Sequence, residues 1–354
     1  MEETNDAGTA LPVSFTGTAR EYFGIWIVNI LLTIVTLGLY FPWAKVRTMR
    51  YFYGNTQLDD SPFDYLASPK AIFKGWLIAL AVFIAYSAIT KLVPLTGPLF
   101  TLVFVFALPW IIVRSMGFRL RNTAYRNIRF NFDKNYREAI KVFVGIAMLL
   151  PFTLGLIFPY YLYRQKKFYV THAAFGQDRF QFPAMARKFY EIYLVVAMIF
   201  LALVVAMSFT LPAALSPMVP PLPVRTANGM AMSVPWVPII LMASLMLTSL
   251  LSYPYLQAAV TNAVWNNASV AGHRFESTLT TAGLMRLYFI NSLAIMFSFG
   301  LMVPWARVRL ARYRAENITL LANGDLSGFI AAATSQESAT GEELGEVFDV
   351  DVGL

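Results

Sequence analysis

Small polar residues and glycines recur inside three apolar runs of this 354-residue chain. Each run is interrupted by a glycine four residues before a proline, in Thr-Leu-Gly at 36–38 and 153–155 and in Ser-Phe-Gly at 298–300. A break of this kind frees backbone carbonyls near the bilayer centre, where transporters coordinate solutes and ions. The candidate transport-site residues are Asn29, Thr33, Thr36, Gly38, Thr153, Gly155, Asn291, Ser292, Ser298 and Gly300. The plainer interpretation, which we favour, is that Gly permits a turn and Thr or Ser caps it.

Two carboxylates, Glu21 and Glu138, stand at the starts of two of these runs, each directly after an arginine. Acidic residues are costly in hydrocarbon and often mark a proton or cation pathway, so both join the transport candidates. A Glu in the first turn of a helix also complements the helix dipole, and this is the plainer interpretation. The same reasoning applies to Glu191, which opens the fifth apolar run.

Arginines interleaved with aromatic residues follow the apolar runs. Guanidinium groups match the geometry of phosphate, so these residues could form a pocket for an anionic lipid or substrate. Alternatively, they set topology and anchor the chain at the headgroup layer. The lipid- or anion-binding candidates are Arg47, Arg50, Arg114, Arg164, Arg309 and Arg312, with Trp43 and Trp305.

The sequence has few residues suited to metal binding or catalysis. The chain has no cysteine and only two histidines, His172 and His273, which lie far apart in sequence without an acidic cluster nearby. A metal site would need more ligands, and we interpret His172 as a hydrogen-bonding residue of a turn. No P-loop, dinucleotide fingerprint, nucleophile elbow or pair of catalytic carboxylates is found. We therefore predict no enzyme activity, no metal and no cofactor.

The elements that carry these residues are predicted to lie in a membrane. The chain is 57% hydrophobic and only 14% charged, with a mean hydropathy of +0.56. Seven apolar runs reach or approach the length that a bilayer requires. They are 22–43, 71–93, 97–113, 142–163, 190–215, 236–256 and 284–306. Residues 22–336 carry 27 basic and 10 acidic side chains, a net charge of +17, and we expect anionic lipid headgroups rather than nucleic acid to face them.

One unit is repeated five times along the chain. Numbered from its proline, each copy has an aromatic residue at +1 and Asn or His at +13, and four of the five have Arg at +5 and Phe at +21. The prolines are Pro42, Pro109, Pro159, Pro254 and Pro304. The aromatic anchors at the headgroup level, and the alternating segment around the Phe predicts a short strand. Internal duplication follows, although Asp325 replaces the Phe of the last copy.

Charge counting predicts the topology. Seven simple crossings would leave 18 basic residues on one side of the membrane and 10 on the other. If the three broken runs instead enter and return on one side, 26 of the 28 lie together, and only Lys91 and Arg225 lie across the membrane. The positive-inside rule favours the second arrangement, with the basic linkers cytoplasmic.

The predicted fold is therefore an all-α polytopic membrane protein built from internal repeats. It has four spanning helices, three broken segments that could be re-entrant, and short β-strands in cytoplasmic linkers; seven transmembrane helices are the alternative. The expected organisation is a polar tail at 1–12, membrane repeats at 13–129 and 130–274, a partial repeat at 275–332 and an acidic disordered tail at 333–354.

The segment FTGTAREYFGIWIVNILLTIVTLGLYFPWAKVRTMRYFYGNTQL (15–58) resembles the YjgN-like family of bacterial membrane proteins, also called domain of unknown function 898. The resemblance rests on Phe-x-Gly, Tyr-Phe, Thr-Leu-Gly-x-Tyr, Pro-Trp-Ala and Arg-x-x-Arg-Tyr, and PWARVR at 304–309 repeats part of this pattern. Ser-Phe-Gly and Asp325 in the last copy depart from it. The resemblance implies a multi-pass inner-membrane protein of a Gram-negative bacterium and supplies no activity.

Three classes of function compete at this stage. We favour a non-catalytic protein that binds anionic lipid or organises the membrane, because so few charges lie at membrane depth. A transporter or channel for a small solute, using the Thr-Leu-Gly breaks, is the alternative, and a membrane enzyme is third. The substrate and the oligomeric state are not specified by the sequence.

Overall fold

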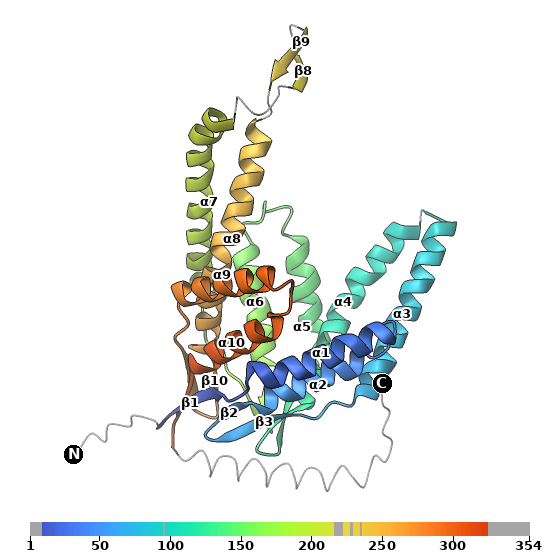
Figure 1. Cartoon of the computed structure of the whole chain (residues 1–354), viewed down its shortest axis with the longest axis vertical. Helices are drawn as coiled ribbons and strands as arrows, with labels where there is room; N and C mark the ends of the chain where they lie inside the picture. The colour runs from blue at the N-terminus through green and yellow to red at the C-terminus, as the bar shows by residue number, and fades with distance from the viewer. Residues whose placement is uncertain (1–8, 95, 216–221, 227–228, 234–235, 325–354) are drawn as a thin grey trace, which may run out of the picture.

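The chain folds into one antiparallel sheet with helices rising from it (Figure 1). This computed structural model describes residues 9–94, 96–215, 222–226, 229–233 and 236–324, so the acidic tail expected at 333–354 lies outside the described residues. The strand order is β10-β11-β12-β1-β2-β3-β4-β5-β6-β7. Beyond β7, Gln181 also pairs with Ser269 of β10, with N···O distances of 2.8 and 3.1 Å. The ten strands therefore form a nearly closed barrel.

Each copy of the repeat contributes one hairpin to the barrel. Four hairpins are continuous in sequence: β2 (Thr56–Leu58) with β3 (Ser61–Tyr65), β4 (Thr123–Tyr125) with β5 (Ile128–Phe132), β6 (Ala173–Phe175) with β7 (Asp178–Arg179), and β10 (Ser269–Val270) with β11 (His273–Ser277). The fifth joins the two ends of the chain, because β12 (Ile318–Ala322) pairs with β1 (Thr9–Phe15).

The fifth hairpin explains why the last copy lacks its Phe. The residues at +21, such as Phe63 and Phe130, pack against the buried core of the barrel. In the last copy β1 supplies the second strand, and its Val13 packs against the same core, so the residue at +21, Asp325, is not needed there. Six buried side chains form this core: Leu58, Tyr125, Ile128, Phe175, Val270 and Leu320.

The predicted all-α fold with short strands confined to linkers is wrong, because the strands of all five copies join into one sheet. A hairpin whose strands have two to seven residues cannot bury its apolar face alone. Five such hairpins placed edge to edge pair each other's backbone groups and enclose a shared core. The stability of these short strands therefore comes from the assembled ring rather than from any single hairpin.

The helices between the hairpins also follow the repeat. They are α1 (Ala19–Val35), α2 (Phe41–Gly54), α3 (Pro69–Leu92), α4 (Thr96–Arg121), α5 (Tyr136–Ile140), the π-helix η1 (Lys141–Ile146), α6 (Phe158–Thr171), α7 (Ala186–Leu215), α8 (Trp236–Trp265), α9 (Thr281–Phe297) and α10 (Val303–Glu316). A small hairpin of β8 (Leu222–Thr226) and β9 (Gly229–Ser233) lies between α7 and α8. Consecutive helices pack side by side, and α10 packs on α1, so the helices form a ring above the barrel.

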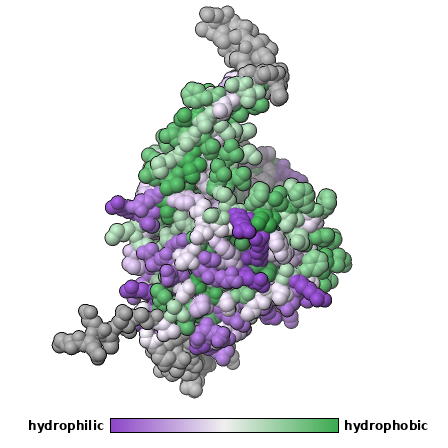
Figure 2. Space-filling view, turned by 60° about the vertical axis from the view of Figure 1, so that its left-hand side comes forward, coloured by the Kyte–Doolittle hydropathy of each residue, from purple (hydrophilic) through white to green (hydrophobic). Residues whose placement is uncertain are grey.

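Four helices among the described residues are long and apolar enough to cross a membrane: α3, α4, α7 and α8. Figure 2 shows a mostly hydrophobic surface on the long helices and hydrophilic side chains gathered below them. At most 22% of the apolar window of each of these helices is buried inside the chain, and no residue of α3 is buried. Hydrocarbon is the surrounding in which such a surface is stable.

The three breaks are tight turns between two helices. Gly38, Gly155 and Gly300 adopt φ values of +93°, +81° and +91°, and the residue before each is also left-handed. The Gly38 amide donates to the Thr33 carbonyl at 2.7 Å, and the other two glycines repeat this six-residue closure at 2.9 Å, which is the Schellman arrangement. The turns place Leu37, Leu154 and Phe299 at tips, where each is more than nine-tenths exposed.

Closure of the barrel by β1 and β12 is testable with cysteines, since the chain has none of its own. Ala10 and Leu321 are direct partners across the two strands, and antiparallel partners have the Cα spacing that a disulfide requires. We expect Ala10→Cys/Leu321→Cys to form an intramolecular disulfide on mild oxidation, seen as faster migration on a non-reducing gel.

The matched control is Ala10→Cys/Asp64→Cys, because Asp64 lies on β3, which does not neighbour β1. Equal cross-linking in both variants, or none in the first, would contradict the observed strand order.

Candidate functional site

The residue at +13 joins the helix end of each copy to the barrel. Four asparagines at this position donate through Nδ2 to the carbonyl four residues earlier, at 2.7–2.9 Å: Asn55, Asn122, Asn267 and Asn317. His172 takes the same place and contacts the Phe168 carbonyl through Nδ1 at 3.0 Å. The interpretation of His172 as a turn residue is confirmed.

In the first and last copies, the arginine at +8 ties the same helix to the chain that leaves the barrel. Arg50 donates to the carbonyls of Tyr65 and Ala67, both at 3.3 Å, and Arg312 donates to the Gly17 carbonyl at 2.9 Å. Two of the predicted anion-binding arginines therefore already hold backbone oxygens. Each guanidinium keeps further N–H groups that can bind an anion.

Two of the arginines at +5 stack on the aromatic residue at +1 of their own copy. Arg309 stacks over the Trp305 ring at 5.1 Å, and Arg114 stacks over Trp110 at 5.3 Å. Trp43 packs on Phe73 instead, and Arg47 of that copy is exposed. Cation–π stacking orients a guanidinium without consuming its donors.

Two of these arginines, Arg309 and Arg312, meet at one cavity of about 390 Å³ between α9 and α10, which we call the arginine pocket. Arg286 of α9 adds a third guanidinium, and Tyr313 and Glu316 complete the polar lining. Three cations against one carboxylate leave a net charge of +2. Such a site can bind phosphate or carboxylate through paired N–H donors.

The absence of a side chain at Gly283 shapes the pocket. A Cβ there would collide with the Tyr313 hydroxyl, which lies 3.2 Å from Oγ1 of Thr280, the N-cap of α9. The sequence prediction included Arg309 and Arg312 but missed Arg286 and Glu316. A signal for Arg286 was present, because it is a charged residue inside the apolar run 284–306.

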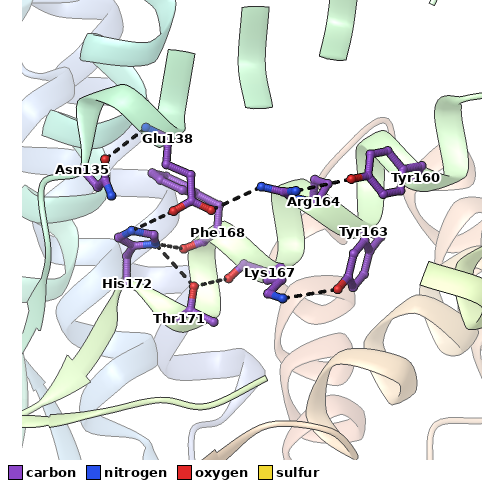
Figure 3. Close-up of polar contacts among 9 residues, drawn as sticks. All are labelled: Asn135, Glu138, Tyr160, Tyr163, Arg164, Lys167, Phe168, Thr171 and His172. Carbon is purple, nitrogen blue, oxygen red and sulfur yellow. Dashed lines mark hydrogen bonds and ion pairs between the residues drawn. The ribbon is translucent and has the colours of Figure 1, made fainter. Parts of the chain in front are cut away.

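A second polar cluster links α5 to α6 (Figure 3). Glu138 contacts Arg164 at 3.5 Å and His172 at 3.4 Å, and Arg164 also donates to the Tyr160 hydroxyl at 3.3 Å. The structure thus brings together Glu138, predicted for transport, and Arg164, predicted for anion binding. Paired with each other, they join α5 to α6 rather than facing an open site.

Proton placement in this cluster follows from the contacts of His172. The Phe168 carbonyl can only accept, so Nδ1 carries a proton, and Nε2 faces the Glu138 carboxylate. Among the residues that the structure describes, no group of three or more His, Asp or Glu side chains could hold a metal ion.

Glu21 has the corresponding place on α1 and caps that helix. Its amide donates to Oγ1 of Thr18 at 3.3 Å, and its carboxylate accepts from the Thr18 amide and from the Tyr51 hydroxyl. Burial together with the hydrogen bond to Glu21 raises the pKa of Tyr51 to about 12. Tyr51 therefore remains a proton donor throughout the physiological range.

The polar residues of the breaks have backbone partners close by. Asn29 donates to the Ala44 carbonyl and Asn291 to the Ala306 carbonyl, both at 3.3 Å, so each holds two helices of a hairpin together. The hydroxyls donate to carbonyls three or four residues earlier; these residues are Thr33, Thr36, Thr153 and Ser298. The exposed tips of the three breaks lie on separate hairpins, and the structure does not bring them together at one site.

Loss of the Glu138 carboxylate should loosen the α5–α6 junction. Arg164 and Glu138 are both about 30% exposed, so Glu138→Gln leaves a half-buried guanidinium without its counter-ion. We expect about 1–3 kcal/mol lower stability, measured by thermal unfolding in detergent. Glu191→Gln is the control, because its partner Arg187 is 87% exposed and such pairs contribute little. Equal effects would contradict a structural role for Glu138.

Comparison with known proteins places these features in a family. The inner membrane protein YjgN of Salmonella typhimurium (strain LT2) is 34% identical over 148 residues, which cover 40% of this chain and 36% of that relative. YjgN of Escherichia coli K12 is 29% identical over 145 residues, 41% of this chain and 36% of the relative. The matched part is thus little more than a third of the curated relatives' length. No solved structure matches the chain.

The family model described as bacterial protein of unknown function (DUF898) matches residues 10–347, a range that includes all ten barrel strands except the first residue of β1. With four helices of membrane length and relatives named as inner membrane proteins, this chain is a membrane protein that belongs to the DUF898 family.

Proposed function

We propose that this chain is a non-catalytic, multi-pass protein of the bacterial inner membrane that binds anionic lipid headgroups in the arginine pocket. The observation that supports this function is the convergence of three guanidinium groups on one cavity of about 390 Å³. Lipid phosphate is the most abundant anion at the depth where an interfacial aromatic residue such as Trp305 anchors.

The sidedness of the barrel supports the same proposal. The linkers of all five copies share one sheet and therefore lie on the same side of any membrane that the long helices cross. With 26 of 28 basic residues on that side, the barrel is cytoplasmic under the positive-inside rule. Solute transport through the breaks has less support, because the amide nitrogens of Asn29 and Asn291 bond to nearby backbone and the barrel core is apolar.

Lipid binding can be tested by removing charge from the pocket. Arg286→Gln/Arg309→Gln spares Arg312, whose contact with Gly17 is structural. We expect at least about a tenfold loss of phosphatidylglycerol affinity, since charge-assisted hydrogen bonds exceed 1.4 kcal/mol. The affinity is measured by titrating lipid into the protein in nanodiscs and counting bound lipids by native mass spectrometry.

The matched control is Arg187→Gln/Lys188→Gln, which removes the same charge from the start of α7. If both variants lose affinity equally, the binding is diffuse attraction to the basic surface, and the proposed pocket is wrong. An equal loss of zwitterionic lipid in the pocket variant would also contradict headgroup recognition.

Sidedness has its own test with single cysteines. We expect Asp64→Cys and Gln177→Cys to react with an impermeant maleimide only in inverted vesicles, since both residues lie in the barrel. Lys91→Cys, at the far end of α3, should react only in intact cells. Labelling of Gln177→Cys from the side opposite to Asp64→Cys would show that the barrel residues do not share one side.

A further inference from the structure

A second cavity, of about 720 Å³, opens on the outer surface between α8 and α9 and is separate from the arginine pocket. Its lining is apolar along α8, with Met246 and Leu250 exposed, and small side chains such as Ala243 and Ser292 leave it hollow. Because α8 is one of the four helices of membrane length, the groove opens into hydrocarbon.

The length of the groove matches one half of a bilayer. Its lining on α8 extends from Ala243 to Pro254, eleven residues apart, which is about 17 Å of helix. The hydrocarbon core is about 30 Å thick, so this is the depth that a single acyl chain covers in one leaflet.

The end of the groove nearer to the barrel is lined by two tyrosines, and a guanidinium that is not part of the lining contacts one of them. There the rings of Tyr253 and Tyr288 lie 5.3 Å apart, and Arg314 of α10 donates to the Tyr288 hydroxyl at 3.4 Å. Pro254 follows Tyr253 in the sequence and is the proline of the fourth copy of the repeat, with Tyr255 as its aromatic residue at +1. This end of the groove therefore lies at the headgroup level. A groove that is apolar along its length and has a guanidinium near one end complements an anionic amphiphile.

We propose that this groove holds one acyl chain of an anionic phospholipid, with the phosphate against Arg314 and the tyrosine hydroxyls. Arg314 lines neither cavity but bonds to Tyr288 of the groove, and the two cavities share no lining residue. The protein then has two lipid contacts on opposite sides of α9, one for a headgroup and one for a chain with its phosphate.

The test uses phosphatidylglycerol with a diazirine halfway along one acyl chain, reconstituted with the full chain in nanodiscs. After irradiation, peptide mass spectrometry should find adducts concentrated at Met246 and Tyr253. Leu250→Trp fills the groove and should remove most of these adducts. Leu251→Trp is the matched control, because it lies at the same depth, is 42% exposed and does not line the groove.

Two further variants separate this proposal from the function proposed above. Arg314→Gln should weaken labelling by about tenfold, whereas Arg286→Gln/Arg309→Gln should leave it unchanged. Adducts spread evenly over α3, α4 and α8, or unaffected by Leu250→Trp, would overturn the acyl-chain site. Labelling that survives Arg314→Gln would overturn phosphate recognition, and loss of labelling in the double variant would overturn the separation of the two sites.

Discussion

Antiparallel pairing between β1 and β12 joins the first and last of the described strands, and the arrangement of the other strands depends on it. Four of the five hairpins form from adjacent residues, but an open row of four hairpins would leave two unpaired edges and an uncovered core. Residues 9–12 of β1 pair with β12, and residues 13–15 pair with β2, so a single strand completes the ring. The long-range contact converts a series of local turns into one domain.

Closure of the barrel also determines the positions of the helices. Helices enter and leave the barrel at neighbouring points, and each packs on the next, including α10 on α1. Across that last contact Arg312 reaches the Gly17 carbonyl and Arg307 donates to the Tyr22 hydroxyl at 3.0 Å. The arginine pocket therefore lies beside the junction of the first and last repeats, and its geometry depends on the pairing of the chain ends.

The repeats share one plan but differ in what they present to the membrane. The segments between Pro42 and Pro109 and between Pro159 and Pro254 contain the four long apolar helices, whereas the other three form short hairpins with apolar tips. The small residues that remain buried on α8, Ser244, Thr248 and Ser252, follow a four-residue spacing that suits close packing of helices. Lipid contacts then fall where packing is incomplete, as between α8 and α9.

The sequence by itself determined the features that local chemistry controls. The periodic prolines, aromatics and asparagines identified the copies, Gly38, Gly155 and Gly300 identified the breaks, and composition identified the membrane. Arg309 and Arg312 were predicted as anion ligands, but Arg286 was missed because its closeness to them depends on how α9 packs on α10. Likewise, the ten-stranded barrel, the pairing of Glu138 with Arg164 and the use of β1 in the last repeat were decided only by tertiary structure. Those contacts join residues far apart in sequence, and no local propensity encodes which edges or side chains will meet.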